Sequence, residues 1–320
     1  MSELTIFAIG ELLVEFASHR EGCALAELSD FSGPYPSGAP AICIDQAARM
    51  GAQTALYGGL GEDNFGKVLM DRLQSDGVDT NGIQRVPNKT TAVAFVSYFK
   101  DGSRTFIFHI DNTAADAFEP GRIRVPAEPT ILHVSGASLG NAKMREAIER
   151  AVSEVAASGG RVSCDPNARP ELMSDPQTRA ALFNIMAKST YLFPSTSDLD
   201  FLFPDKSEDE AVRELLGHGA EIVALKRGEE GCVVFTGSQR FSLSGHAVDE
   251  VDPTGAGDCF CGTFLAMLAK GRTPRDAGIC ANAAGAIAVT RRGAMEGNSS
   301  PREIDQFISA QSSTASAQAI

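Results

Sequence analysis

The chain has 320 residues, of which 43% are hydrophobic, enough to bury one large core or one core with a small appendage. Its formal net charge is −13 at pH 7. A negative field of this size repels nucleic acid and anionic membranes, so we expect neither as a partner, and an anionic substrate must be met by local cations.

Apolar runs of strand length alternate with longer segments of helical period along most of the chain. Apolar strands that alternate with helices predict an α/β fold, in which a parallel sheet is covered on both faces. The strand candidates are 6–9, 54–57, 131–134, 162–164, 191–193 and 222–225, and the helix candidates are 39–50, 65–75, 142–157, 177–187, 208–216 and 274–290.

Two stretches break this alternation. Residues 12–16 continue from the first strand, and 91–99 with 105–110 are typical of a hairpin whose strands alternate in polarity, so that one face is exposed. We interpret them as a small β appendage that serves as a lid or as a dimer surface. The predicted division is 1–11, 37–88 and 113–308 for the α/β domain, 12–36 and 89–112 for the lid, and 309–320, rich in Ser, Ala and Gln, for a disordered tail.

The cysteine and hydropathy patterns favour a cytoplasmic protein. The seven cysteines are odd in number and show no CxxC or HxxxH spacing, which indicates free thiols in a reducing compartment. Cys259 and Cys261 are expected to be small packing residues. The N-terminus lacks a basic region followed by a long apolar run, and no segment of about 20 apolar residues occurs. We therefore expect a soluble protein that is not exported.

The most informative motif is Val-Asp-Pro-Thr-Gly-Ala-Gly-Asp-Cys-Phe at 251–260. A turn that opens into a helix leaves its first N–H groups unpaired and concentrates positive dipole there, which suits an anion. Asp258 stands where it could take a proton from a hydroxyl that attacks this anion. The alternative is that Gly255 and Gly257 only shape a loop and that Asp258 caps the helix. We favour the first interpretation, which is phosphoryl transfer to an alcohol.

A second glycine motif, at 61–68, nearly matches a Walker A loop. Its last position is Val68, which cannot supply a hydroxyl to magnesium, and Glu62 and Asp63 would face the phosphates with like charge. We interpret it as a connection between a strand and a helix, with Asp63 as the helix cap. No GxGxxG follows a strand, so a dinucleotide site has little support.

These blocks together resemble the ribokinase-like (PfkB) family of carbohydrate kinases, over nearly the full chain. Residues 252–258 match the C-terminal signature of that family, 37–41 and 59–66 resemble its N-terminal signature, and 165–169 and 225–231 recur in its sugar-kinase branches. The resemblance implies a Rossmann-like, mostly parallel sheet with helices on both faces, a small β-sheet lid, ATP as the donor, Mg²⁺, and often a monovalent cation such as K⁺ near the C-terminal signature.

The resemblance also implies roles for individual residues. Asp258 would be the general base, and the amides of Gly255, Ala256 and Gly257 would form the anion hole. The other implied assignments are Glu15, Gly38, Arg104, Asp165, Asn167 and Arg169 for substrate, Lys226, Gly228, Thr254 and Asn282 for nucleotide, and Asp198 and Asp252 for metal.

Several of these residues keep a second interpretation. Arg104 follows the hairpin turn and either reaches into the cleft from the lid or is solvated. Asn282 lies near the adenine pocket or is a half-buried polar residue on its alanine-rich helix. Glu15 accepts two sugar hydroxyl protons or is a surface residue of the strand. Residues 165–169 bind ligand at the carboxyl end of a strand or form an Asx-type turn at Pro166.

The chain departs from the family pattern at three places. The first glycine of the usual N-terminal pair is Ser37, and Ile42 stands where many members carry a sugar-binding asparagine. The Asn-x-x-Glu stretch that organises Mg²⁺ and phosphate appears as 195–198, Ser-Thr-Ser-Asp. Asp198 keeps a carboxylate, so metal organisation could survive. Loss of hydrogen bonding at Ile42 affects the identity of the sugar more than the reaction.

The sequence therefore predicts ATP-dependent phosphorylation of a terminal hydroxyl of a small sugar. The fructokinase and 2-keto-3-deoxygluconate kinase branches are the most similar, and a ketohexose such as fructose or tagatose is the preferred substrate. The alternatives are 2-keto-3-deoxygluconate, a sugar acid, or a catalytically lapsed sugar-binding protein on the kinase scaffold. We expect a homodimer formed through the lid.

Overall fold

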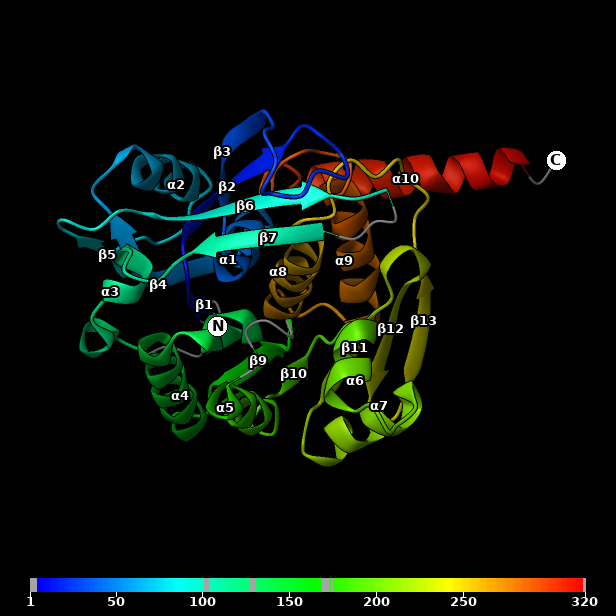
Figure 1. Cartoon of the computed structure of the whole chain (residues 1–320). Coiled ribbons are helices and arrows are strands. Elements are labelled where there is room, and N and C mark those ends of the chain that lie inside the picture. The colour runs from blue at the N-terminus through cyan, green and yellow to red at the C-terminus, as the bar shows by residue number, and fades with distance from the viewer. Residues whose placement is uncertain (1–4, 101–103, 127–129, 169–172, 174, 319–320) are drawn as a thin grey trace.

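The computed structural model describes residues 5–100, 104–126, 130–168, 173 and 175–318. Its centre is a large sheet with the strand order β13-β12-β11-β10-β9-β8-β1-β4-β5 (Figure 1). The strands from β11 through β5 in this order pair in parallel, whereas β12 and β13 are antiparallel additions at one edge. The bounds are β1 Thr5–Ile9, β4 Gln53–Gly61, β5 Ile83–Val86, β8 Thr130–Ser135, β9 Arg161–Asp165, β10 Tyr191–Leu192, β11 Ile222–Lys226, β12 Gly231–Thr236 and β13 Arg240–Ser244.

The central strands are apolar throughout because both faces of the sheet are buried. In β1, Ile6 and Ala8 pack into one hydrophobic cluster, and Phe7 and Ile9 pack into the cluster on the opposite face. This alternation follows from the two-residue period of a strand. The predicted mostly parallel α/β sheet with two covered faces is confirmed.

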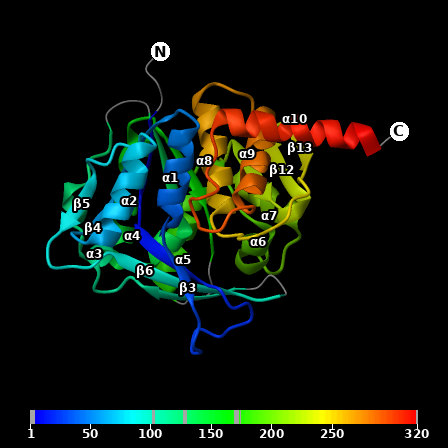
Figure 2. The ribbon, with the colours of Figure 1, turned by 90° about the horizontal axis from the view of Figure 1, so that it is seen from above.

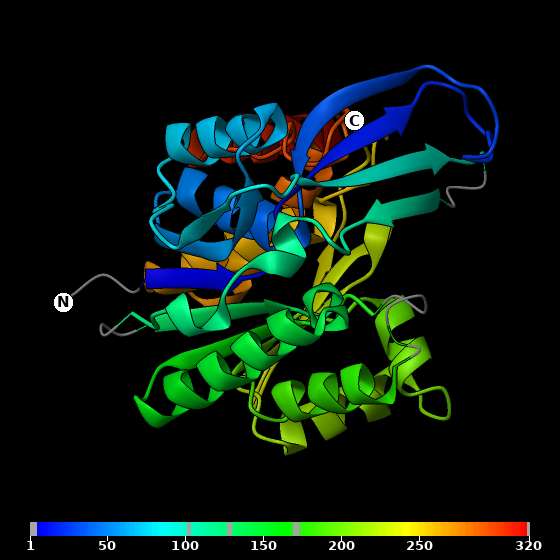
Figure 3. The same cartoon turned by 60° about the vertical axis from the view of Figure 1, so that its left-hand side comes forward.

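Helices cover the two faces as separate layers, as the rotated views show (Figures 2 and 3). The first cluster is formed by α1, α2, α8, α9 and the start of α10, and the second by α4, α5, α6 and α7. The bounds are α1 Ala39–Arg49, α2 Asn64–Ser75, α3 Ala114–Ala117, α4 Ala142–Ala157, α5 Pro176–Met186, α6 Thr196–Leu202, α7 Glu208–Gly217, α8 Ala256–Ala269, α9 Pro274–Ala288 and α10 Pro301–Gln318, with short 3₁₀ helices at Pro120–Arg122, Gly136–Gly140 and Gly228–Glu230.

A separate four-stranded sheet forms the lid, with the order β3-β2-β6-β7. It contains β2 Leu13–Ser18, β3 Phe31–Ser37, β6 Ala92–Tyr98 and β7 Arg104–His109. The predicted hairpin corresponds to the antiparallel pair of β6 and β7. Phe16 stacks on Phe95 with ring centroids 5.6 Å apart, and Phe31 meets the edge of Phe95. These aromatic contacts give the small sheet a packed face of its own.

After Leu12 the chain leaves the large sheet and enters the lid as β2. The structure differs from the sequence predictions at two places. The hairpin of β12 and β13 was not predicted. The expected disordered tail from 309 instead continues α10 to Gln318; Ala and Gln are good helix formers, and the helix is already established at Pro301. None of the described helices combines the length and apolarity needed to cross a bilayer.

Candidate active site

A single large cleft gathers most of the residues that the sequence singled out. It has a volume of 1410 Å³ and runs between the lid and the carboxyl edge of the large sheet. Arg169 lies outside the described residues. Asp252 is buried and does not line the cleft. The predicted site residues that do line it are Glu15, Gly38, Arg104, Asp165, Asn167, Asp198, Lys226, Gly228, Thr254, Gly255, Ala256, Gly257, Asp258 and Asn282.

The order of the strands arranges these side chains along the cleft. Glu11 follows β1, Asp165 ends β9, and Lys226 ends β11, so they succeed one another along one edge of the sheet. The lid strands β2 and β7 bring Glu15 and Arg104 to the cleft from the lid side. Parallel strands present their carboxyl ends on the same side, which is where open α/β sheets bind ligands.

The glycine turn enters α8 in a conformation that requires glycine. Gly255 is the N-cap, with a φ of 82° in the left-handed region. A Cβ atom on Gly255 would lie 2.4 Å from the carbonyl oxygen of Ala294. The amide of Ala256 contacts the carbonyl oxygen of Pro253 at 3.5 Å, which is at the limit of a hydrogen bond. A helix of 14 residues therefore begins at the cleft wall with donors that can face an anion.

Asp258 is not the helix cap, because Gly255 occupies that position. Asp258 lies in the first turn of α8, is 9% exposed, and lines the cleft. Asp258 therefore lines the same cleft as Gly255, Ala256 and Gly257 of the turn. The structure thereby favours the interpretation of Asp258 as a functional group over the interpretation as a cap.

A lysine and two carboxylates meet beside the glycine turn. Lys226 forms an ion pair with Asp165, which is almost fully buried. Burial is the largest single influence and would lower the pKa of Lys226, but the charges of Asp165, Cys261 and Asp198 together with the hydrogen bond to Asp165 raise this pKa above its usual range. Burial, followed by the charge of Asp165, raises the pKa of Asp198. The group therefore carries a fixed positive charge and two crowded carboxylates.

The 195–198 stretch folds as a capping box at the start of α6. The Ser195 side chain accepts a hydrogen bond from the amide of Asp198, and the Asp198 carboxylate accepts from the amide of Ser195. The other Asp198 oxygen accepts from the amide of Ala168 at 2.7 Å. Although the chain lacks the Asn-x-x-Glu pattern here, Ser195 and Asp198 bond to each other, and this capping box holds the Asp198 carboxylate in place.

Asn167 forms the Asx-type turn that was one of the two interpretations of 165–169, and it also lines the cleft. Its amide donates to Asp165 Oδ1 at 3.1 Å, which is the Asx-type turn, and its φ of 36° lies in the left-handed region. Its side chain donates to Ser135 Oγ at 3.3 Å. Because Asn167 also lines the cleft, the turn serves to present it there.

Two further predicted residues line the cleft with local partners. The Asn282 side chain donates to the carbonyl oxygens of Leu243 and Ser244, both at 3.2 Å, so it secures the end of β13. Arg104 places its guanidinium over the ring of Phe106, 5.6 Å from the centroid, and remains exposed. Both therefore border the cleft while they also make ordinary structural contacts.

Asp252 lies behind the glycine turn. Its Oδ1 accepts from the Tyr98 hydroxyl at 2.5 Å and from the amide of Thr254 at 3.0 Å. Its Oδ2 accepts from the amide of Gly293 at 2.9 Å. Protein donors thus surround this carboxylate, and its assignment to a metal stays a prediction.

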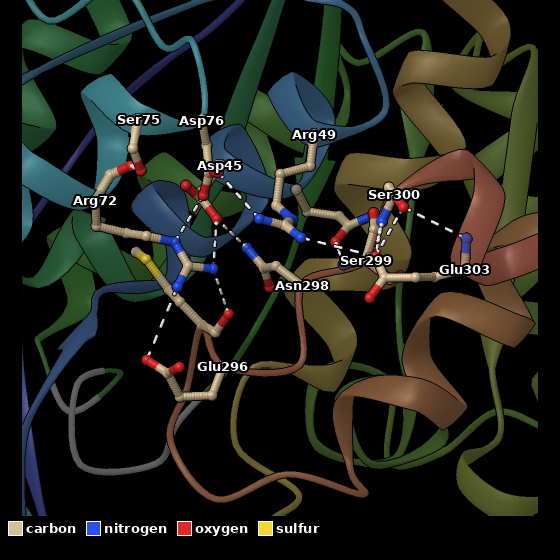
Figure 4. A network of polar contacts seen from close by, with 12 residues as sticks. Asp45, Arg49, Arg72, Ser75, Asp76, Glu296, Asn298, Ser299, Ser300 and Glu303 are labelled. Atoms are coloured by element: carbon tan, nitrogen blue, oxygen red, sulfur yellow. Dashed lines mark hydrogen bonds and ion pairs between the residues drawn. The ribbon is translucent and has the colours of Figure 1, made fainter.

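A buried polar network supports the same turn from the side of α1 and α2 (Figure 4). Arg72 donates to the carbonyl oxygen of Met295 at 2.7 Å, and Asn298 donates to Asp45 at 2.6 Å. The Cys259 thiol donates to Asn298 at 2.8 Å. Burial, which outweighs the charge of Arg72, raises the pKa of Asp45 to about 7. The network fixes the loop that contacts Gly255 through Ala294.

Glu11 is a cleft residue that the sequence reasoning missed. It is 9% exposed and accepts a hydrogen bond of 2.6 Å from Ser138. The available signal was its place directly after the first strand, where ligands of such sheets bind. Ile42 also lines the cleft, and its Cδ1 atom lies 3.4 Å from the position of a Cβ atom on Gly255. The apolar side chain at 42 therefore packs against the glycine turn.

Known proteins resemble this chain over almost its whole length. A family model described as pfkB family carbohydrate kinase matches residues 4–301. The probable fructokinase-3 of Arabidopsis thaliana is 32% identical over 301 residues, which cover 91% of this chain and 87% of the relative.

Solved structures agree with this match. An E. coli protein described as a ribokinase II, in complex with ATP and Mg²⁺, has a TM-score of 0.90 at 38% identity, with 96% of this chain and 99% of that chain covered. The fructokinase of Vibrio cholerae O395, with fructose, ADP and a calcium ion bound, has a TM-score of 0.83 at 26% identity, with the same coverage of 96% and 99%.

Proposed function

Because this chain belongs to the pfkB family of carbohydrate kinases and is an ATP-dependent sugar kinase, we propose that it phosphorylates a terminal hydroxyl of a neutral ketohexose such as fructose or tagatose. The curated relatives support a ketohexose, since fructokinases match at 30–32% identity. The charge of the cleft supports a neutral acceptor.

The distribution of charge is the observation that carries this proposal. Glu11 and Glu15 lie at the β1 end of the cleft, and Asp258 borders the same space. Carboxylates accept hydrogen bonds from sugar hydroxyls and repel a carboxylate. Among the lining residues that the structure describes, Arg104 and Lys226 are the only Lys or Arg, and Lys226 is already paired with Asp165. A sugar acid would depend on Arg104, so 2-keto-3-deoxygluconate is the less favoured acceptor.

The reaction would then follow from the geometry of the turn. Asp258 would take the proton of the attacking hydroxyl, and the amides of Gly255, Ala256 and Gly257 would stabilise the negative charge of the migrating group. Such oriented donors contribute about 3–4 kcal/mol each to the transition state. Glu15 would orient the sugar, and Gly38, which has no side chain, would let the protein backbone approach the sugar. The lid would exclude water so that ATP is not hydrolysed.

The nucleotide would occupy the β11 end of the cleft, where Lys226, Gly228, Thr254 and Asn282 lie. The carboxylates of Asp165 and Asp198, which both line the cleft, would supply the hard oxygen ligands that Mg²⁺ prefers. Bound there, Mg²⁺ would neutralise phosphate charge. Asp198 fits this role better than Asp252, because Asp198 lines the cleft and Asp252 does not. Dependence on K⁺ stays a prediction, tested by activity in KCl against NaCl.

The lid offers a surface for a homodimer. Strand β7 is an edge strand of the lid sheet, and the side chain of Ile107 is 51% exposed. An unpaired edge with apolar side chains favours pairing with a second chain. Sedimentation of the wild type and of Ile107→Lys tests this: we expect a dimer that the charged variant dissociates, and a wild-type monomer would contradict it.

The substrate is tested by measuring ADP release with ATP, Mg²⁺ and a panel of ketoses, aldoses and sugar acids. We expect the highest kcat/KM with a ketohexose, and little change for it in Arg104→Gln. A preference for 2-keto-3-deoxygluconate that Arg104→Gln abolishes would overturn the neutral acceptor. Sugar-induced thermal shifts without ADP release for any sugar would overturn the proposed reaction.

A further inference from the structure

We propose that Tyr98 is a positioning residue that couples the lid to the anion-binding turn. The inference rests on the proposed function, because it assigns Tyr98 to the same phosphoryl transfer. Tyr98 ends the lid strand β6, Ala92–Tyr98, and does not line the cleft. It therefore acts through the residues that it holds and not through the substrate.

The hydroxyl of Tyr98 joins two groups just before the glycine turn. It lies 2.5 Å from Asp252 Oδ1 and 2.7 Å from Thr254 Oγ1. The Tyr98 hydroxyl donates to the Asp252 carboxylate, and a hydrogen bond to a charged group belongs to the stronger class.

Asp252 passes this restraint to the other side of the turn. The second oxygen of Asp252 accepts a hydrogen bond from the amide of Gly293. The next residue is Ala294, and its carbonyl oxygen would lie 2.4 Å from a Cβ atom on Gly255. A second lid strand reaches the same loop, because the ring of Tyr35 would lie 2.6 Å from a Cβ atom on Gly293. A displacement of the lid is therefore transmitted to both backbone segments that shape the anion-binding turn.

The lid sheet also connects Tyr98 to Glu15 in the cleft. Glu15 lies on β2, and β2 pairs with β6 in the lid sheet. A sugar held by Glu15 would set the position of β6, and the Tyr98 hydroxyl would set the position of Thr254. This arrangement assembles the anion site only when the lid is in place.

The test is Tyr98→Phe, which removes one oxygen and keeps the ring packed. A lost hydrogen bond to a charged group corresponds to a decrease of roughly 10- to 100-fold. We expect kcat for the sugar to fall by about that factor, with the KM for ATP and the thermal midpoint almost unchanged. We also expect a larger ratio of ATP hydrolysis to sugar phosphorylation, because the looser turn admits water. Tyr57→Phe on β4 is the matched control, since its half-buried ring packs on Phe7 outside the cleft.

A double-mutant cycle with Thr254→Val separates positioning from a loss of stability. We expect the losses in kcat of Tyr98→Phe and Thr254→Val to be far from additive, because both remove the same contact. Tyr98→Phe with kcat within twofold of the wild type, or strictly additive losses, would overturn the inference. A wild type that phosphorylates no sugar would instead overturn the proposed function, so the two failures are distinguishable.

Discussion

The Nζ atom of Lys226 lies 3.3 Å from the position that a Cβ atom would occupy on Gly257. The cation from β11 and the backbone from α8 therefore border one small space at the cleft wall. The amides at the start of α8 and the positive charge of Lys226 border the same space, and both groups bind phosphate well. A side chain at position 257 would lie between the amides and the ammonium group.

Gly257→Ala is expected to lower activity without unfolding the protein. The added methyl group would push against the Lys226 ammonium, which must move away from its position beside the turn. We expect kcat to fall by at least about tenfold, since oriented donors of this kind are worth a hundredfold or more. Gly217→Ala is the control, because Gly217 ends a helix and an added Cβ atom there would meet nothing within 4 Å. Steady-state kinetics and thermal unfolding of both variants make the comparison.

The substitution Lys226→Met removes the cation that is proposed to contact the ATP phosphates, and it leaves Asp165 without its ion-pair partner. We expect kcat/KM for ATP to fall roughly 100-fold, and the pKa of Asp198 to rise further once its nearest cation is absent. Titration of kcat/KM for ATP against pH measures this, with the exposed Lys67→Met as a control. An unchanged kcat/KM for ATP would remove Lys226 from the nucleotide site.

The raised pKa of Asp45 predicts that the free energy of unfolding depends on pH. Burial raises its pKa from 3.8 to about 7 against the opposing charge of Arg72, while Asp76 adds to the rise and Asn298 opposes it. The folded state therefore binds this proton more tightly than the unfolded state, and the contribution to the free energy of unfolding decreases as the pH rises from about 4 to about 7.

Asp45→Asn removes this titration while it keeps the size of the side chain. We expect its free energy of unfolding in urea to change less between pH 5 and pH 8 than that of the wild type. Asp71→Asn, on an exposed carboxylate of α2, is the control. Equal pH slopes for the wild type and Asp45→Asn would show that Asp45 is already ionised in the folded protein at pH 5.

The elements that were predicted well are those whose own residues contain a helix cap or a regular apolar period. Asp63 caps α2 as expected, by accepting from the amide of Gly66 at 2.8 Å. Helix α4 has the predicted bounds 142–157, because Asn141 caps it and its apolar period is regular. The hairpin of β12 and β13 was missed because β13 alternates in burial and lacks a continuous apolar run.

The site was predictable only as a set of motifs. The glycine turn and Asp258 are contiguous in sequence, so their chemistry could be interpreted without coordinates. The contact between Tyr98 and Asp252 joins residues 154 positions apart, and the contact between Ser138 and Glu11 joins residues 127 apart. Such pairs depend on how the lid and the strands pack, which neither propensity nor periodicity specifies.

The measurement that bears most directly on the account is the turnover of Asp258→Asn with ATP, Mg²⁺ and the best ketohexose. The substitution keeps the shape of the side chain and removes its ability to take a proton. We predict a decrease in kcat of roughly 100- to 10,000-fold, with an unchanged thermal midpoint and retained ATP binding. Turnover equal to that of the wild type would contradict the assignment of Asp258 as the general base.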